Sequence, residues 1–228
     1  VFSEMGFRED IMRVPLFGLG CAGGVSGLSV AQALAEGKTN AKILLVVVET
    51  CSLSFRADRL QKADIIATVL FGDGSAAACI SSSEPTTGKV VSLGQGHQKM
   101  WPDTLGIMGW DVDETGFGVV FDRSIPSFAT DGALKAAGLN HSQIDRYVCH
   151  PGGAKVVDAI ECALHLGQGS LDAERDTLRA AGNMSAPTVM FVMKAVLEAG
   201  TTGQMMACAL GPGFTASFLP FYVSEDAA

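Results

Sequence analysis

"FGLGCAGGVSGL", residues 17–28, places a single cysteine, Cys21, between an apolar run and a Gly-Gly step. The residues before it, 13–20, have the composition of a β-strand, and those from Gly24 to about Glu36 have the spacing of a helix. A strand that turns directly into a helix is the repeating unit of α/β folds. The stretch therefore predicts an α/β chain with a thiol at the tip of a strand-to-helix turn.

The same alternation continues along the 228 residues. Strands are predicted at 41–50, 74–83, 88–95 and 145–150, in a hairpin at 108–122, and as a pair around the Gly-Pro-Gly of 204–223. Helices are predicted at 127–137, 154–166, 172–181 and 187–199. The run at 41–50 is expected to be a buried strand because it is apolar almost throughout.

Composition excludes several classes of function. A net charge of −8 with no dense basic stripe argues against nucleic acid as a partner. The longest apolar run, Ile43 to Val48, is far shorter than the roughly 20 residues of a membrane helix, and the charged first residues do not form a signal peptide. The six cysteines lack C-x-x-C spacing, which predicts reduced thiols in a cytoplasmic protein and no zinc site.

The position of Cys21 has a chemical and a structural interpretation. A cysteine at a helix N-terminus lies near the positive end of the helix dipole, which favours the nucleophilic thiolate. Gly23 and Gly24 would then let a substrate carbonyl approach the backbone closely. The alternative is a small buried side chain in a tight turn.

A nucleophilic thiol needs a base within hydrogen-bond reach, and His150 is the candidate among four histidines. It ends a predicted strand and precedes Pro-Gly-Gly, so its ring can point out of the strand end into a cleft. Asn183 lies between two predicted helices, where its amide could stabilise an oxyanion or enolate without adding charge. The alternative for His150 is a structural histidine, and the alternative for Asn183 is a turn or capping residue.

These segments, GCAGG (20–24), HPGGAK (150–155) and GNMSAP (182–187), resemble the Cys-His-Asn motifs of the type III polyketide synthases, the chalcone-synthase-like branch of the thiolase superfamily. Three further blocks in the same order resemble that family: ETCSLSFR (49–56), LFGDGSAA (70–77) and GPGFT (211–215). MGWDVDETGF (108–117) suggests a bacterial type.

The resemblance implies a thiolase-like layered αβαβα fold in two halves. Residues 1–86 would be the remainder of an N-terminal half that carries the nucleophile, and residues 87–228 a C-terminal half that carries the histidine and asparagine. Members of the family are longer before the nucleophile, so the first half is expected to be incomplete at its N-terminus. A cytoplasmic homodimer is implied, without nucleic acid or membrane as a partner.

The resemblance also implies a mechanism. Cys21 would carry the acyl group of an acyl-CoA starter, with its thiolate held as an ion pair by His150. His150 and Asn183 would polarise the thioester carbonyl of malonyl-CoA, so that loss of CO2 leaves an enolate that attacks the Cys21 thioester. Repeated condensation and cyclisation would give a pyrone or phenolic product. No metal or redox cofactor is implied, because loss of CO2 drives formation of the carbon–carbon bond.

Four residues fall where the family shapes its substrate cavity. Phe71 aligns with a gatekeeper between the CoA tunnel and the cavity, and Phe117 is a candidate for a second one. Cys51 and Ser54 fall where small polar residues line the pocket for the starter and for cyclisation. Core packing is the alternative for both phenylalanines, and an ordinary strand-end turn is the alternative for Cys51 and Ser54.

Two further residues are candidates for substrate binding. Lys155 could reach a CoA phosphate, or be a solvated lysine in the first turn of its helix. Ser185 could line the pocket, or act as the N-cap of the helix that Pro187 begins.

Three alternatives to the synthase remain. Ketoacyl synthase III enzymes share the Cys-His-Asn set, but the Pro-Gly-Gly after His150 and the LFGDG block favour the polyketide branch. Papain-like peptidases also order Cys, His and Asn in this way, but their signature C-G-[SA]-C-[WY] is absent around Cys21. The third alternative is a non-catalytic thiolase-fold fragment that only dimerises or binds a partner.

Overall fold

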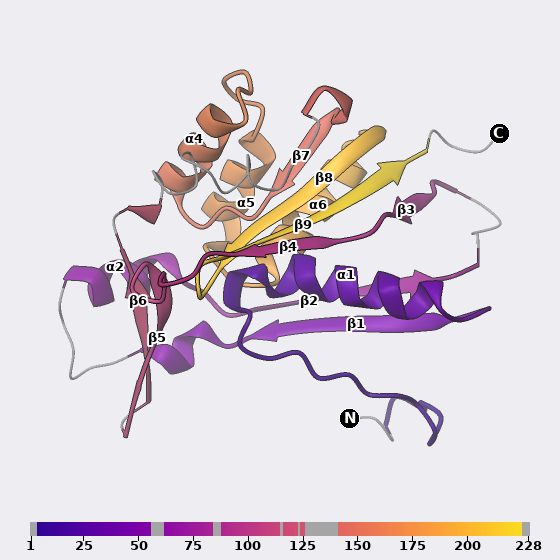
Figure 1. Cartoon of the computed structure of the whole chain (residues 1–228), viewed down its shortest axis with the longest axis horizontal. Coiled ribbons are helices and arrows are strands. Elements are labelled where there is room, and N and C mark those ends of the chain that lie inside the picture. Colours follow the sequence, from indigo (N-terminus) through magenta and orange to yellow (C-terminus); the bar gives the residue numbers. More distant parts are fainter. Residues whose placement is uncertain are drawn as a thin grey trace.

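The computed structural model describes residues 4–55, 62–83, 88–114, 116–122, 124–125 and 141–224, so the helix predicted at 127–137 lies outside the described residues. The strands are β1 (Lys42–Glu49), β2 (Gly74–Ser81), β3 (Val91–Leu93), β4 (His97–Met100), β5 (Met108–Asp113), β6 (Gly116–Phe121), β7 (Arg146–Cys149), β8 (Gly203–Gly211) and β9 (Thr215–Val223) (Figure 1). The helices are α1 (Gly23–Glu36), α2 (Lys62–Leu70), α4 (Ala154–Ala163), α5 (Asp172–Ala181) and α6 (Thr188–Glu198), with 3-10 turns η1 (Gly20–Ala22), η2 (Cys51–Ser54) and η5 (His141–Gln143).

The larger sheet forms the centre of the molecule. Its order is β3-β9-β8-β7, with β4 also paired to β9. β7 and β8 run parallel, whereas β8 and β9 form an antiparallel pair from Gly203↔Val223 to Gly211↔Thr215. The Gly-Pro-Gly between β8 and β9 therefore forms the turn that the sequence predicts.

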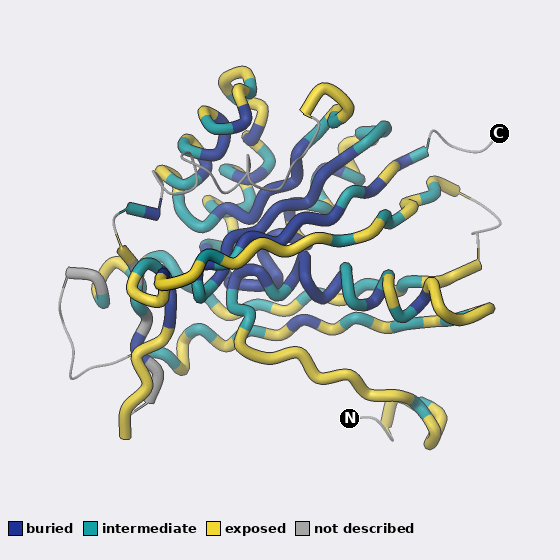
Figure 2. The backbone as a smooth tube through the Cα atoms, viewed as in Figure 1, coloured by how far each residue is buried: buried dark blue, intermediate teal, exposed yellow. Residues whose placement is uncertain are grey.

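Alternate residues of β8 face opposite sides of this sheet. Met206, Cys208 and Leu210 pack against Val157 and Ile160 of α4. Met205, Ala207 and Ala209 pack against a second group of apolar side chains, on α1 and α6: Val25, Leu28, Val189 and Val192. Helix α4 thus covers one face of the sheet, and α1 and α6 cover the other (Figures 1 and 2).

A smaller antiparallel sheet, β1–β2, lies on the far side of α1 (Figure 1). The order of layers is therefore sheet, helices, sheet, helix, which confirms the predicted layered α/β class. In β1 only Val47 is fully buried, whereas Val46 and Val48 on the opposite face are 57% and 62% exposed. The expectation of a wholly buried strand is wrong, because α1 covers one face of β1 and no described residue covers the other.

The other predicted elements on described residues are confirmed, with one exception. No strand forms at 13–20: these residues pair with no described strand and are mostly exposed (Figure 2). The side chain of Phe17 is 91% exposed. A β-strand needs a neighbour for its backbone hydrogen bonds, so its composition alone is not sufficient. Helix α2 and strand β4 are additional elements that the sequence patterns did not predict.

None of the helices among the described residues combines the length and the apolar character needed to cross a bilayer.

Candidate active site

Cys21 lies in the turn η1, directly before the first residue of α1, and its side chain is buried. The turn depends on Gly20, whose φ of +48° lies in the left-handed region. A Cβ on Gly20 would lie only 2.7 Å from Cδ of Pro212, in the turn between β8 and β9. The glycine thus allows the larger sheet to approach the turn that carries the thiol.

Gly24 brings α1 against the segment that precedes α6. A Cβ on Gly24 would lie 2.3 Å from the main-chain oxygen of Ala186 and 2.8 Å from Cγ1 of Val189. A Cβ on Gly23 would lie 3.1 Å from Cβ of Ala186. The expectation of room for a substrate carbonyl is wrong for Gly24, because protein fills the space beside it, whereas Gly23 lines a large pocket that opens in front of Cys21.

His150 follows the last residue of β7, and its main-chain N–H donates to the oxygen of Cys208 at 2.8 Å. Its side chain is only 4% exposed, yet neither Nδ1 nor Nε2 has a hydrogen-bond partner among the described residues. A buried polar group without a partner costs folding free energy, and such groups concentrate at functional sites. The imidazole is therefore poised for a ligand that none of the described residues provides.

Cys21, His150 and Asn183 line one small internal cavity, whose other walls include the side chains of Met108, Ile125, Val156 and Leu210. Its volume is about 20 Å³, the size of one water molecule or one substrate oxygen atom. The structure thus brings together the thiol, imidazole and amide that the sequence singled out, although 128 residues of chain lie between the first two and only the fold can make them neighbours.

The side chain of Asn183 is held at both ends. Its Nδ2 donates to the main-chain oxygen of Gly152 at 3.1 Å, and its Oδ1 accepts the N–H of Ser185 at 2.8 Å. Its own backbone bonds to the segment before β2, since its N–H donates to Leu70 and its oxygen accepts from Gly72, both at 2.9 Å. The amide is therefore fixed in one orientation, with Nδ2 on the side of His150.

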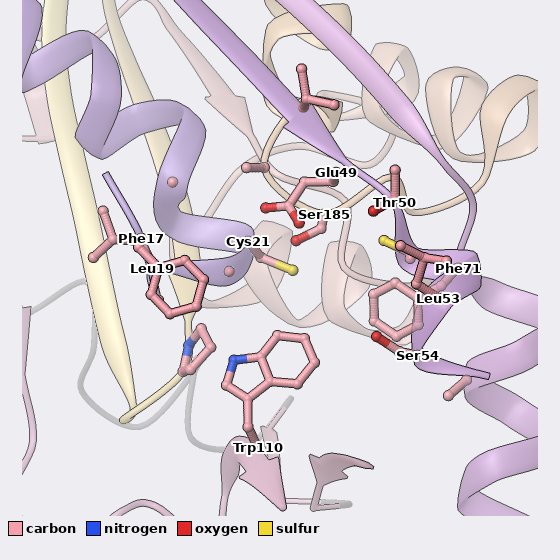
Figure 3. A pocket seen from close by; sticks show the side chains of 18 of the residues that line it. Phe17, Leu19, Cys21, Glu49, Thr50, Leu53, Ser54, Phe71, Trp110 and Ser185 are labelled. Atoms are coloured by element: carbon pink, nitrogen blue, oxygen red, sulfur yellow. The ribbon is translucent and has the colours of Figure 1, made fainter. Parts of the chain in front are cut away.

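Ser185 is not the cap of α6. Pro187 takes the N-cap position, and Thr188 Oγ1 accepts the N–H of Met184 at 2.9 Å. Ser185 has a φ of 59°, and its hydroxyl faces Cys21 and Glu49 (Figure 3). The pocket interpretation of Ser185 is therefore the one that the geometry favours.

Burial dominates the electrostatics of the site. The pKa of the Cys21 thiol is raised to about 11, first by burial and then by the Glu49 carboxylate, while hydrogen bonds from Ser185 and Asn183 lower it in part. Burial also lowers the pKa of His150 to about 4. Burial therefore opposes both charges of the expected thiolate–imidazolium pair, because a low-dielectric interior penalises the thiolate and the imidazolium alike.

A large pocket of about 1200 Å³ opens in front of Cys21 (Figure 3). Four of the predicted substrate-binding residues line it: Cys51, Ser54, Phe71 and Ser185. Cys51 and Ser54 belong to the turn η2, which lies across the pocket from Cys21 (Figure 3). Most of the remaining lining is aliphatic or aromatic, so the pocket suits an apolar chain.

Of the other two predicted substrate-binding residues, one cannot be placed in or out of this group and the other lies outside it. Phe117 lies in β6 opposite Val112, but its side chain is outside the described part of the structure. Lys155 is exposed in the first turn of α4 and does not line the pocket.

Glu49 is a pocket residue that the sequence analysis missed. It ends β1 beside Cys21, and its carboxylate faces Ser185 and Ala186. Burial raises the pKa of this carboxyl, and the nearby Ser185 hydroxyl and Ala186 N–H lower it in part. A lone carboxylate at the end of the apolar run 43–48 was the available signal. Trp110 of β5, whose indole faces the Cys21 side of the pocket, was also missed (Figure 3).

Comparison with known families gives two matches that together span most of the chain. Residues 1–85 match the N-terminal domain, and residues 92–221 the C-terminal domain, of the chalcone and stilbene synthases.

Individual relatives agree with this. The chain is 36% identical over 232 residues to a 1,3,6,8-tetrahydroxynaphthalene synthase of Streptomyces peucetius subsp. caesius, covering 95% of this chain and 60% of that protein. It is 30% identical over 231 residues to type III polyketide synthase C of Arabidopsis thaliana, covering 93% of this chain and 60% of that protein.

The fold is similar to solved structures of such enzymes. The crystal structure of 1,3,6,8-tetrahydroxynaphthalene synthase from Streptomyces coelicolor A3(2), a bacterial type III polyketide synthase, matches 98% of this chain with a TM-score of 0.89 at 27% identity. The match covers 66% of that enzyme, and the chain spans about 60% of the length of the curated relatives above.

Proposed function

Because the chain belongs to the chalcone and stilbene synthase family, we propose that it acts as a type III polyketide synthase. In this proposal an acyl-CoA starter is loaded on Cys21 and extended by decarboxylative condensation with malonyl-CoA, and the product cyclises to a pyrone or phenol. The single observation that carries the proposal is the cavity that Cys21, His150 and Asn183 share, with an imidazole that has no partner among the described residues.

Loading begins from the neutral site. Cys21 Sγ attacks the thioester carbonyl of the acyl-CoA while the imidazole of His150, neutral because its pKa is lowered, accepts the thiol proton. The carbon–sulfur bond to coenzyme A breaks, the proton passes to the departing thiolate, and an acyl-Cys21 thioester remains. Proton transfer during the attack removes the need for a standing thiolate in a site whose burial disfavours it.

Extension uses the imidazole and the amide as hydrogen-bond donors. With the thioester oxygen of malonyl-CoA in the small cavity, the second N–H of the Asn183 amide and the His150 ring stabilise the enolate that forms when CO2 leaves. The enolate carbon then attacks the acyl-Cys21 carbonyl, a carbon–carbon bond forms, and the Cys21 thiolate is released and reprotonated. Because Asn183 is fixed by its own hydrogen bonds, it does not have to reorganise in this step.

The substrates, cofactors and oligomeric state in this proposal follow from its chemistry. CoA thioesters are the substrates, and no metal or redox cofactor takes part, because loss of CO2 drives the bond formation. The chain works as a homodimer in the cytoplasm, and the exposed apolar side chains of Leu16 and Phe17 support a surface that a partner covers.

The test is incubation with an acyl-CoA panel and malonyl-CoA labelled with ¹³C at its C2 carbon, followed by mass spectrometry of the released products. Products that gain several labelled units, and that Cys21→Ala abolishes, are expected. A single extension would favour the ketoacyl synthase III-like alternative. A folded protein that forms neither products nor an acyl adduct would support the non-catalytic fragment and overturn the proposal.

A further inference from the structure

The turn η2, which carries Cys51 and Ser54 into the large pocket, is held from outside the pocket by one side chain. Asp73 Oδ1 accepts the main-chain N–H of Ser52 at 2.7 Å, and Asp73 Oδ2 accepts its hydroxyl at 2.6 Å. Ser52 lies between Cys51 and Ser54 and, like them, lines the pocket. A carboxylate that accepts two hydrogen bonds from one residue fixes both the position and the orientation of that residue.

Asp73 is itself anchored to the catalytic asparagine. The residues Leu70–Asp73 join α2 to β2, and within them Gly72 N–H donates to the oxygen of Asn183 while Leu70 accepts its N–H, both at 2.9 Å. Phe71 of the same segment lines the pocket. The segment Leu70–Asp73, called the strap below, is therefore hydrogen-bonded both to Asn183 and to η2.

Strand β6 also packs against η2, but between described residues no other hydrogen bond links η2 to a distant segment. Within the turn, Leu53 N–H donates to Thr50 and Phe55 N–H donates to Ser52, and both bonds are local. Leu53 is 81% exposed, so burial of its side chain does not anchor the turn. The two bonds to Asp73 also lower the pKa of this carboxyl, so it accepts them as a carboxylate across the neutral range.

We propose that Asp73 is a specificity-determining positioning residue, which sets the width of the acyl pocket by holding the Cys51–Ser54 turn at a fixed distance from the strap bonded to Asn183. The inference rests on the proposed function, since it concerns how the loaded acyl chain is accommodated. The side chain of Asp73 does not line the pocket, so it acts through the turn and not by touching the substrate.

The chain offers a matched control for a loss of stability alone. Asp145 is likewise exposed and accepts a main-chain N–H from a distant segment, that of Gln204 at 2.8 Å, but it lies outside the pocket. Asp145→Ala therefore removes a comparable bond without altering the acyl site. Asp73→Asn is the conservative variant, because its amide oxygen can still accept the Ser52 N–H and its amide nitrogen can donate to the Ser52 hydroxyl.

The experiment measures the second-order rate of acyl-adduct formation on Cys21 for straight-chain acyl-CoAs from acetyl to dodecanoyl. For Asp73→Ala, the ratio of rates between the fastest and slowest donor should fall by about tenfold. One methylene contact with a pocket wall contributes about this much discrimination, and it is lost when the wall is displaced. Asp73→Asn and Asp145→Ala should keep the wild-type ratio. Ser52→Ala should lower it by about threefold, since only the hydroxyl bond is lost, and should add nothing in the Asp73→Ala background.

The outcomes separate the inference from the function on which it rests. If wild-type Cys21 takes no acyl group, the proposed function fails. If Cys21 is loaded but Asp73→Ala keeps the wild-type ratio, or the wild type loads all donors equally, only the role of Asp73 is overturned. If Asp73→Ala does not fold, Ser52→Ala, which changes only a hydroxyl, decides the question by the same ratio.

Discussion

The side-chain amide of Asn183 donates a hydrogen bond to the main-chain oxygen of Gly152, at 3.1 Å. This bond joins the segment after α5 to the loop that follows His150, so the amide proposed to stabilise the enolate is held by the loop that carries the imidazole. Neither segment lies close to the other in sequence. The geometry of the site therefore depends on the way α5, α6 and β7 pack together.

Replacing Asn183 by alanine should separate loading from decarboxylation. We expect malonyl-CoA decarboxylation to slow by about 10²–10³-fold, as for the loss of one oxyanion donor, while loading of Cys21 slows by less than about tenfold. The buried N–H of Ser185 also loses its acceptor, which should lower the free energy of unfolding by about 1–3 kcal/mol. Release of ¹⁴CO2 and urea titration measure the two effects.

Thr188→Val is the matched control for that variant. It leaves another buried N–H, that of Met184, without its acceptor but does not touch the cavity. It should lose similar stability and keep its decarboxylation rate. Equal slowing of both variants would assign the effect of Asn183 to stability alone.

The burial of His150 predicts a pH dependence of stability. Its pKa falls from 6.5 in the unfolded chain to about 4 in the folded protein. As the pH drops from 6.5 to 4, the unfolded chain binds a proton on His150 that the folded protein does not bind. The free energy of unfolding therefore falls on acidification, by about 3 kcal/mol. The facing titratable group, Cys21, does not titrate in this window because its pKa is about 11.

Urea titrations at pH 7 and pH 4.5 check this prediction. The wild type should lose about 2 kcal/mol more than His150→Gln between the two values of pH. Parallel losses in the two proteins would mean that the imidazole is protonated in the folded state.

Glu174 is predicted to be the most sensitive charged residue of the fold. Its carboxylate is buried, binds Arg146 at 2.6 Å and accepts the N–H of Cys149 at 3.0 Å, beside β7, the last strand of the sheet among the described residues. Glu174→Ala should cost about 3–5 kcal/mol, because it leaves a partly buried guanidinium without its partner. Asp176→Ala, which removes the exposed partner of Arg179, should cost less than about 1 kcal/mol. Similar unfolding free energies for the two variants would contradict the claim that the buried Glu174 carboxylate contributes more stability than the exposed Asp176.

The close approach of α1 to the Ser185–Ala186 segment predicts a steric effect. Gly24→Ala places a methyl group 2.3 Å from the oxygen of Ala186, which should cost about 1–3 kcal/mol and shift Cys21 relative to Ser185. Gly37→Ala is the control at the other end of α1, where a Cβ would meet nothing within 4 Å. Thermal unfolding and the rate of Cys21 alkylation should change only in the Gly24 variant. A wild-type alkylation rate there would show that the helix can move without disturbing the thiol.

Local sequence patterns were sufficient to predict most of the helices and strands of the fold. Alternating and helical spacing located β8, β9, α4 and α6, because those elements bury regular faces. The prediction of a strand at 13–20 was wrong, because a strand forms only when a second segment pairs with it, and residues 13–20 pair with no described strand. Strand β4 was missed because HQKM has no apolar face, so its pairing with β9 alone defines it.

The chemistry of the site was predictable where residue type and motif coincide, as for Cys21, His150 and Asn183. The protonation states were not, because the dipole of α1 can be inferred from sequence whereas the burial that outweighs it cannot. Glu49 was missed for a similar reason. Its role depends on the approach of Ser185 and Ala186, which lie more than a hundred residues further along the chain.

Mass spectrometry of the protein after incubation with an acyl-CoA tests the central claim most directly, because a second thiol, Cys51, lines the same pocket. The account predicts one acyl adduct that maps to the peptide containing Cys21, persists in Cys51→Ala and disappears in Cys21→Ala. An adduct that remains in Cys21→Ala, or a folded wild-type protein that accepts no acyl group, would contradict it.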